Sequence, residues 1–420
     1  MTISLAVAIA IFFFISIRQW LPDRIRIWQI MLAGAIILLL IGEISPSKAL
    51  SVIDWNVIAY LFGVFSIAHA LYDCGLPHRI SNFLCKGEIK TSRMLIYFMA
   101  LVAIGSAALT NDAAAVIGTP IALTIAASLG IRPAIPLIAL CVAVTVGSMM
   151  SPVGNPQNIL IVADGHFSNP IGTFLYWLAI PTVLSMIFAY FWYKFCLDRE
   201  APTDTKPVDL PEPTATKSWP AYLSTILLAV LVIGDSVLQE SFPNLDIPLG
   251  WLSLIACLPV YLFSAQRITV AREVDWATLV FFVAMFVVTG SVLESGALQS
   301  ILGPWHTRLN EPAVVTNIAF WASQLFSNVP VVEIYLNLLT TSDEATLMLL
   351  ASMSTLAGNL FIISAASNVI VVQQAEKFGA QPFNFWEFSR LVLPVTIFSI
   401  AVSYAWIVYV MIELVGAGSG

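Results

Sequence analysis

Hydrophobic stretches close to 20 residues long recur along the whole of this 420-residue chain. A helix of about 20 apolar residues spans the hydrocarbon core of a bilayer. Charged residues make up only 10% of the chain and mean hydropathy is +0.89, whereas soluble domains carry about 25% charge. The pattern predicts an all-α polytopic membrane protein. The stretches lie at roughly 3–17, 27–43, 55–74, 135–162, 171–195, 219–239, 247–265, 275–294, 345–373 and 386–412.

Two further apolar regions, 93–129 and 313–341, are interrupted midway by polar residues. Each flank of the interruption is too short to cross the membrane comfortably, so we predict two re-entrant hairpins whose tips end inside the membrane. Broken backbone of this kind is tolerated only where protein or water covers it. The interrupting residues are Thr110, Asn111 and Asp112 in the first region and Ser327 and Asn328 in the second.

The basic residues predict the orientation of the chain. With ten crossings, two non-crossing hairpins and the N-terminus outside, all 18 Lys and Arg residues except Lys48 and Arg308 fall on the cytoplasmic side. Such a positive-inside bias predicts a multi-pass protein of the cell inner (plasma) membrane with both termini outside. The first hairpin then enters from the cytoplasm and the second from outside. Residues 198–218, rich in Pro, Thr and Asp, predict a flexible cytoplasmic linker.

Two helices that begin with an acidic residue and a tryptophan indicate an internal repeat. IDWNVIAYLFGVFSIAHALYDCG (Ile53–Gly75) aligns with VDWATLVFFVAMFVVTGSVLESG (Val274–Gly296). The topology implies an odd number of crossings between them, so the repeats are inverted. Inverted repeats with discontinuous helices are a common plan of secondary transporters, with the substrate site near the midplane. The predicted repeats are 1–197 and 219–420, with hairpins at 93–129 and 313–341 and broken helices at 135–162 and 345–373.

The first polar cluster, SAALTNDAAAV at Ser106–Val116, contains a carboxylate at membrane depth. A charge there is expensive unless it is paired, hydrated or protonated, and such residues mark functional sites by default. We therefore interpret Asp112 as a candidate for proton or cation coupling, with Thr110 and Asn111 as neighbouring binding residues. A structural hydrogen bond that holds the hairpin tip is the alternative.

The second cluster, GSMMSPVGNPQNILI at Gly147–Ile161, predicts a helix break near Ser151–Asn155. Pro152 and Pro156 remove backbone donors, and glycine relaxes the chain. A break exposes carbonyl oxygens, which bind cations, and a helix N-terminus, which binds anions. A simple kink is the alternative. The candidate binding residues are Ser151, Gly154, Asn155 and Asn158.

The second repeat offers QLFSNVPVVEIYL (Gln324–Leu336) and STLAGNLFIISAASNVIVV (Ser354–Val372). No acid matches Asp112 directly. Glu333 lies about one turn further along the hairpin arm, where it either substitutes for that acid in coupling or faces a polar partner. The candidate binding residues are Ser327, Asn328, Gly358, Asn359, Ser364, Ser367 and Asn368, the last of which aligns with Asn158.

These segments resemble the ion-transporter superfamily, which includes arsenite-efflux permeases, sodium/proton antiporters, and sodium-coupled dicarboxylate and citrate symporters. TNDAAAVIGTPIAL is similar to the arsenite-permease pattern, and SPVGNPQNILI is similar to the Gly-x-Pro-x-Asn segment of the citrate and divalent-anion branch. The resemblance covers nearly the whole chain. It implies a scaffold domain and a mobile transport domain that contains both hairpins and both broken helices.

In the sodium-coupled branch, Ser-Asn-Thr hairpin motifs and the facing helix breaks bind sodium, and the substrate sits between them. Here the motifs read Thr-Asn-Asp and Ser-Asn-Val, which departs from that scheme. The resemblance still suggests a sodium ion at Asn111, Asp112 and Asn328, and either sodium or a proton as the coupling ion. No other cofactor is expected.

The expected function is ion-coupled secondary transport of a small anion, citrate-like or another oxyanion, by elevator-type alternating access. Arsenite or antimonite efflux is the main alternative, followed by sodium/proton antiport and a passive channel. No phosphate-binding loop, no basic face for nucleic acid and no catalytic nucleophile–base pair stand out, so we do not expect an enzyme. Besides lipid, the partners considered are a second copy of the chain and, for an arsenite-type transporter, a separate ATPase subunit.

Overall fold

The structure is a computed structural model that describes residues 2–17, 25–85, 91–165, 167, 169–201, 218–241, 247–297, 305, 308–326, 328–339 and 343–417. Over these ranges the chain is helical and contains no β-strand. Most of the predicted linker (202–217) and the candidate Ser327 lie outside the described residues.

The helices fall into two series separated by the linker. The first series is α1 (Ile3–Ser16), α2 (Ile27–Leu40), α3 (Pro46–Ser51), α4 (Trp55–Asp73), α5 (Leu76–Cys85), α6 (Thr91–Ala108), α7 (Asn111–Leu129), α8 (Ala134–Met149), α9 (Pro156–Gly165) and α10 (Pro170–Leu197). The second series is α11 (Trp219–Ser241), α12 (Leu249–Phe263), α13 (Arg267–Glu273), α14 (Trp276–Glu294), α16 (Pro312–Phe326), α17 (Asn328–Leu338), α18 (Glu344–Ala357), the 3-10 turn η3 (Ile362–Ser364), α19 (Ala366–Lys377) and α20 (Phe385–Ala417).

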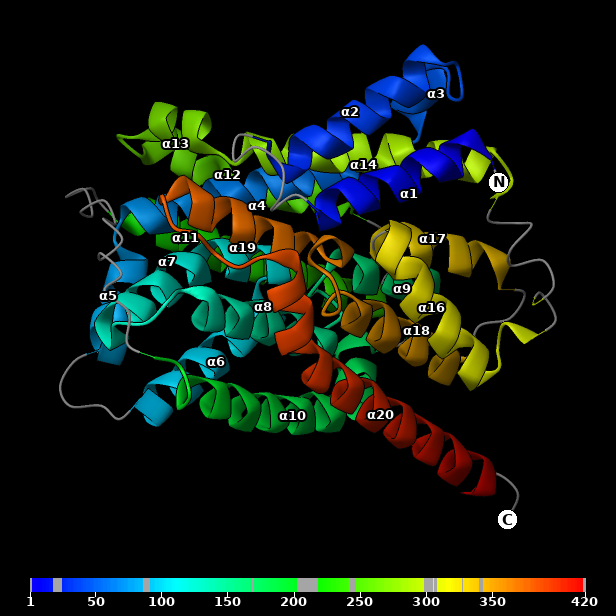
Figure 1. The fold of residues 1–420 in the computed structure, drawn as a ribbon. Helices are drawn as coiled ribbons and strands as arrows, with labels where there is room; N and C mark the ends of the chain where they lie inside the picture. Colours follow the sequence, from blue (N-terminus) through cyan, green and yellow to red (C-terminus); the bar gives the residue numbers. More distant parts are fainter. Residues whose placement is uncertain are drawn as a thin grey trace.

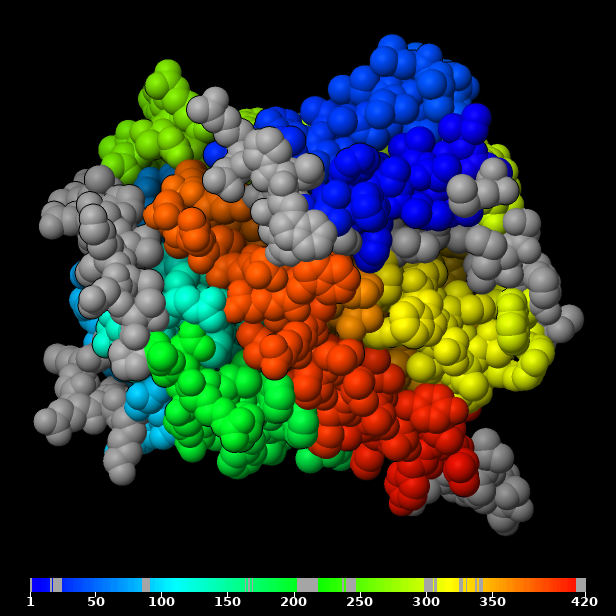
Figure 2. All heavy atoms as spheres, in the orientation of Figure 1, coloured from blue at the N-terminus to red at the C-terminus, as the bar shows by residue number. Residues whose placement is uncertain are grey.

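Apolar helices occupy all ten predicted crossings. Among the described residues, six helices are long and apolar enough to span a membrane: α4, α6, α7, α10, α14 and α20. Shorter apolar helices, α1, α2, α8, α11, α12 and α18, fill the other predicted crossings. Large apolar side chains stay exposed on α10 and α20, which form the green and red surface in Figure 2. The chain is an all-α polytopic membrane protein.

The arms of the first predicted hairpin are longer than the sequence suggested. Helices α6 and α7 have 18 and 19 residues and are long and apolar enough to span a membrane, so the expectation that each arm is too short to cross comfortably was wrong for this pair, while the re-entrant hairpin stays a prediction. The helices gain length because α6 begins at Thr91 and because Asn111 and Asp112 belong to α7 instead of interrupting it. If α6 and α7 both cross the membrane, the chain returns to the side from which it started, as it would after a re-entrant hairpin. The sides predicted for all later loops are therefore the same in both cases.

The two series correspond helix by helix and contact each other reciprocally. Short α3 precedes long α4 as α13 precedes α14, and α8 and α9 flank a break as α18 and α19 do. Helix α4 packs against α12 while α14 packs against α2. Likewise α7 packs against α19 while α17 packs against α9. Each hairpin's second arm therefore lies against the broken helix of the other series.

The broken helices lie in the interior of the molecule. In Figure 1, α1, α2, α12 and α14 run along the top of the view and α10 and α20 along the bottom. Helices α8, α9, α18 and α19 lie between these two layers (Figure 1), and nearly every side chain of α8 and α18 is buried. Any polar group in this interior is shielded from both lipid and bulk water.

Candidate functional site

The tip of the first hairpin is attached to the first broken helix. Thr110 caps α7, because its hydroxyl accepts a hydrogen bond from the Ala113 amide at 3.2 Å. The Asn111 amide donates to the Gly154 carbonyl at 2.8 Å. The Tyr60 hydroxyl of α4 donates to the Leu109 carbonyl at 3.4 Å. The backbone and the threonine cap thus hold the tip in place.

Asp112 is buried without a hydrogen-bond partner. Its side chain is 1% exposed, and neither carboxylate oxygen has a partner among the residues that the structure describes. The Asn111 side-chain oxygen is equally unpartnered. The alternative interpretation, in which a hydrogen bond from Asp112 holds the tip, therefore finds no acceptor or donor here.

The first break, residues 150–155 between α8 and α9, depends on glycine and asparagine. A methyl group at Gly154 would collide with the Ser148 carbonyl oxygen. Asn155 caps α9 through its side-chain oxygen, which accepts from the Asn158 amide at 2.9 Å. The Asn158 side-chain amide donates to the Ser151 carbonyl at 2.8 Å and approaches those of Ser148 and Met149 at 3.4 Å. It thereby adds a donor to carbonyls at and just beyond the end of α8, where the helix no longer supplies intrahelical donors.

The second break, residues 358–365 between α18 and α19, uses its asparagine in the same way. The Asn368 side-chain amide donates to the Gly358 carbonyl at 2.6 Å and approaches that of Phe361 at 3.5 Å. These acceptors lie 10 and 7 residues before the asparagine, as they do for Asn158. In both breaks the asparagine oxygen has no partner in the described part of the chain.

Thr355, in the last turn of α18, connects the first break to the second series. Its hydroxyl oxygen accepts from the Asn155 amide at 3.3 Å and from the Gln157 amide at 3.2 Å. On the other side, a methyl group at Gly358 would lie 3.2 Å from the Asn328 side-chain nitrogen. The predicted residues of both repeats thus meet around the α18 C-terminus. Thr355 and Gln157 were not predicted, since nothing local distinguishes them from packing residues.

Three predicted residues have other roles or positions. The Ser364 hydroxyl donates to the Gln324 side-chain oxygen at 2.5 Å, and Gln324 in turn donates to the Ala357 carbonyl at 3.1 Å, so this serine helps to hold the break. The Ser151 hydroxyl accepts from the Val153 amide at 3.4 Å. Glu333 is exposed on α17 within electrostatic range of Asp54, apart from the buried cluster.

The unpartnered atoms around the two breaks are mainly hydrogen-bond acceptors. Buried carboxylate and amide oxygens without partners attract cations or hydroxyl donors, because desolvated polar groups are costly when unsatisfied. The first turns of α7, α9, α17 and α19 supply partial positive charge in the same region. Among the residues predicted as binding residues, those with unpartnered side-chain atoms in the described part of the chain are Asn111, Asp112, Asn158, Asn328, Asn359, Ser367 and Asn368.

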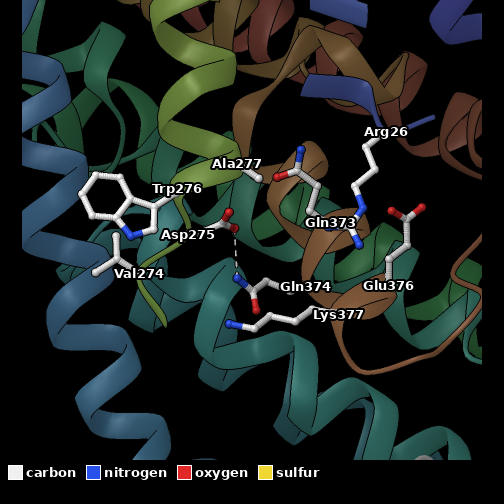
Figure 3. Close-up of a pocket in the computed structure, with 9 residues that line it drawn as sticks. All are labelled: Arg26, Val274, Asp275, Trp276, Ala277, Gln373, Gln374, Glu376 and Lys377. Carbon is white, nitrogen blue, oxygen red and sulfur yellow. Dashed lines mark hydrogen bonds between the residues drawn. The ribbon is translucent and has the colours of Figure 1, made fainter. Parts of the chain in front are cut away.

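A separate cavity of about 230 Å³ lies where the end of α19 meets the start of α14 (Figure 3). The Gln374 side chain reaches across and donates to Asp275 at 3.0 Å. One residue earlier, the Gln373 side-chain oxygen accepts from the Thr278 hydroxyl at 2.6 Å. We call these residues, together with Glu273 and Lys377, the α14–α19 corner. The sequence did not suggest this contact.

An ion pair completes the corner. The Lys377 ammonium lies 2.8 Å from the Glu273 carboxylate. Its hydrogen bond and positive charge hold the pKa of Glu273 below its usual range. Both side chains are nearly half exposed, so this ion pair contributes little to stability.

Comparisons with known proteins agree with this architecture. The family model for the citrate transporter matches residues 11–346. A 46 kDa membrane protein of Mycobacterium leprae is 26% identical, covering 93% of this chain and 96% of that protein. The silicon efflux transporter LSI3 of rice, Oryza sativa, is 25% identical, covering 87% and 89%. The solved YdaH transporter of Alcanivorax borkumensis shares the fold, with a TM-score of 0.50 at 14% identity over 98% of both chains.

The family match spans most of the chain, including both predicted hairpins and the first break. It also agrees with the apolar helices and the buried polar interior described above. The chain belongs to the citrate transporter family of membrane transporters.

Proposed function

We propose that the chain is an ion-coupled secondary transporter of a small carboxylate or other oxyanion, with the two helix breaks as its binding site. The observation that supports this most is that two asparagines, Asn158 and Asn368, close equivalent breaks while their side-chain oxygens stay buried and unpaired. A protein interior seldom leaves such groups unsatisfied unless something binds them.

A cation is the species that the acceptor oxygens fit. Hard cations take carboxylate, carbonyl and amide oxygens as ligands. In this proposal sodium binds near Asn111, Asp112 and Asn328, or a proton binds Asp112 alone. Either event removes an uncompensated buried charge, which costs at least about 2.5–3.5 kcal/mol at membrane depth. Occupancy of Asp112 would then decide whether the hairpin can move through its apolar surroundings.

An anion fits the first turns of the helices that start in this region. Helix N-termini present backbone N–H groups and partial positive charge, and they bind carboxylate and phosphate. A cation on the acceptor oxygens would add to this attraction. Cation and anion would therefore bind cooperatively, which is what symport requires.

Alternating access by an elevator-type movement is the mechanism that we infer. The hairpins and broken helices would move together against α4, α12, α14 and α2. The α14–α19 corner supports this, because hydrogen bonds and an ion pair between side chains join α19 to α13 and α14 there. Such contacts exchange with water more readily than an interdigitated apolar core.

Efflux of an uncharged oxyacid is the second candidate. The rice relative is named a silicon efflux transporter, and arsenous acid resembles silicic acid in being a small hydroxylated molecule that is neutral near pH 7. Hydroxyl groups of such a solute would donate to the same unpaired oxygens. This candidate needs no positive charge around the site.

The test is uptake of citrate, succinate, sulfate, silicic acid and arsenite by proteoliposomes in both orientations, with sodium and pH gradients imposed separately. We expect one of the anions to accumulate only when a cation gradient is present. In Asp112→Asn, exchange of internal for external solute should persist, because the amide keeps the shape of the carboxylate. Accumulation of the solute driven by a cation gradient should be lost, because the amide carries no charge. Unchanged accumulation in Asp112→Asn would remove this residue from coupling. Uptake of silicic acid or arsenite alone would favour the second candidate.

A further inference from the structure

The two helix breaks differ in a way that points to where the anion binds. We propose that the N-terminus of α19, with the hydroxyls of Ser367 and Thr145, is the subsite for the carboxylate or oxyanion group of the solute. This inference rests on the proposed function. It selects one of the four helix starts and adds Thr145, a residue that the sequence did not single out.

The first difference is capping. Helix α9 is capped by Asn155 and begins with Pro156, which has no N–H group to satisfy. The corresponding residues of α19 lie three and two positions before Asn368, as Asn155 and Pro156 do before Asn158, and they are Ala365 and Ala366. Among the described residues, no side chain caps α19. The protein therefore fills the N-terminus of α9 with its own side chain and leaves that of α19 unfilled.

The second difference is a missing bridge. In the first break Gln157 donates to Thr355 of α18 at 3.2 Å. The corresponding pair is Ser367 in α19 and Thr145 in α8, two helices that also pack together. The serine side chain is two atoms shorter than that of glutamine, and neither the Ser367 nor the Thr145 hydroxyl has a partner among the described residues. Both side chains are buried, Ser367 at 0% exposure and Thr145 at 1%.

The unfilled groups have the chemistry of an anion subsite. Ser367 and Thr145 each offer an O–H donor, and the first turn of α19 offers backbone N–H groups. A carboxylate oxygen accepts such bonds, and those to charged groups are stronger than neutral ones. One anion group would replace both the missing cap and the missing bridge. In the first break, Asn155 already caps the helix and Gln157 already bonds to Thr355, so an anion has no corresponding place to bind.

The test compares hydroxyl deletions in purified protein. Ser367→Ala and Thr145→Val should each raise the concentration of citrate, succinate or sulfate needed for half-maximal thermal protection by about tenfold, since a hydrogen bond to a charged group is lost. Melting without anion should stay the same or rise, because a buried hydroxyl without a partner is removed. A group that only packs would show neither change.

Matched controls carry the same chemical change at satisfied hydroxyls. Ser352 donates to the Met348 carbonyl at 2.8 Å and Thr119 to the Ala115 carbonyl at 2.7 Å, each within its own helix. Ser352→Ala and Thr119→Val should bind the anion like the wild type. In addition, Ala365→Asn would copy the Asn155 cap into α19 and should exclude the anion.

The outcomes separate the two proposals. If an anion protects the wild type, Ser367→Ala and Thr145→Val equally, the subsite is wrong and the proposed function stands. If none of the three anions protects or is transported by the wild type, the proposed function fails and the subsite fails with it. Weaker protection in both hydroxyl deletions, with unchanged controls, supports the subsite.

Discussion

The two ends of α19 use polar side chains in opposite ways. At its N-terminal end, Ser367 and the Asn368 oxygen are buried without partners. At its C-terminal end, Gln374 and Lys377 bond to Asp275 and Glu273. At the N-terminal end these hydrogen-bonding groups are unused, whereas at the C-terminal end Gln374 and Lys377 contact α14 and α13 and only the ion pair is nearly half exposed.

This difference separates the side chains that hold α19 against α13 and α14 from those that are available to bind a solute. Unsatisfied buried groups lower stability, and a protein retains them where binding compensates for the loss. The α14–α19 corner lies next to a cavity, and its Glu273–Lys377 ion pair is nearly half exposed, so this ion pair can be exchanged for water at low cost. We expect substitutions at the buried end to change transport strongly and substitutions at the corner to change it weakly.

The largest effect is expected for Asn368→Leu. Leucine has the same number of side-chain heavy atoms but cannot donate to the Gly358 carbonyl, and leaving a buried acceptor unpaired costs about 1–3 kcal/mol. Asn158→Leu should behave alike because its amide does the same in the first break. Both variants should insert into the membrane. Their transport rates should fall by at least about a hundredfold, since every ~1.4 kcal/mol corresponds to a tenfold change.

The control for these variants is Asn317→Leu on α16. That exposed asparagine donates to the Ala313 carbonyl of its own helix at 2.8 Å, so its loss should leave uptake unchanged. Uptake per inserted molecule is the measurement. Near-normal rates in Asn158→Leu and Asn368→Leu would mean that the two asparagines only pack.

A smaller effect is expected at the corner. Gln374→Ala removes the bond to Asp275, and a hydrogen bond of this kind contributes about 0.5–1.5 kcal/mol, or a two- to tenfold change in an equilibrium. The contact between α14 and α19 should therefore open more often. A cysteine placed in the cavity by Ala277→Cys should be labelled faster by a thiol reagent in the Gln374→Ala background. Equal labelling rates in both backgrounds would show that the corner does not open.

The smallest effect concerns the Glu273–Lys377 ion pair and pH. Because Lys377 lowers the pKa of Glu273, the pair stabilises the protein above the ordinary glutamate pKa, and the contribution is lost as pH falls through the lowered value. For a largely exposed pair it amounts to about 0–1 kcal/mol. Lys377→Met should lower the melting temperature slightly at pH 7 and not at strongly acidic pH. A difference that grows on acidification would contradict the assignment.

Much of this architecture could be predicted from the sequence because it is determined locally. Runs of about 20 apolar residues give the spans, and Pro152, Gly154 and Pro156 stop α8 and start α9. The correspondence between Asn158 and Asn368 also follows from aligning the sequences of the two repeats. The arm lengths of the first hairpin were misjudged, since Asn111 and Asp112 were counted as a break although they form the first turn of α7.

Only the tertiary structure decided which polar atoms are satisfied. The Gln157–Thr355 bond joins residues 198 apart and the Thr278–Gln373 bond joins residues 95 apart, and no local pattern encodes such pairs. The same holds for Ser364, which Gln324 satisfies, and for Asp112 and Ser367, which no described residue satisfies. Helix starts and stops depend on neighbouring residues, whereas the partner of a buried side chain depends on what distant segments bring beside it.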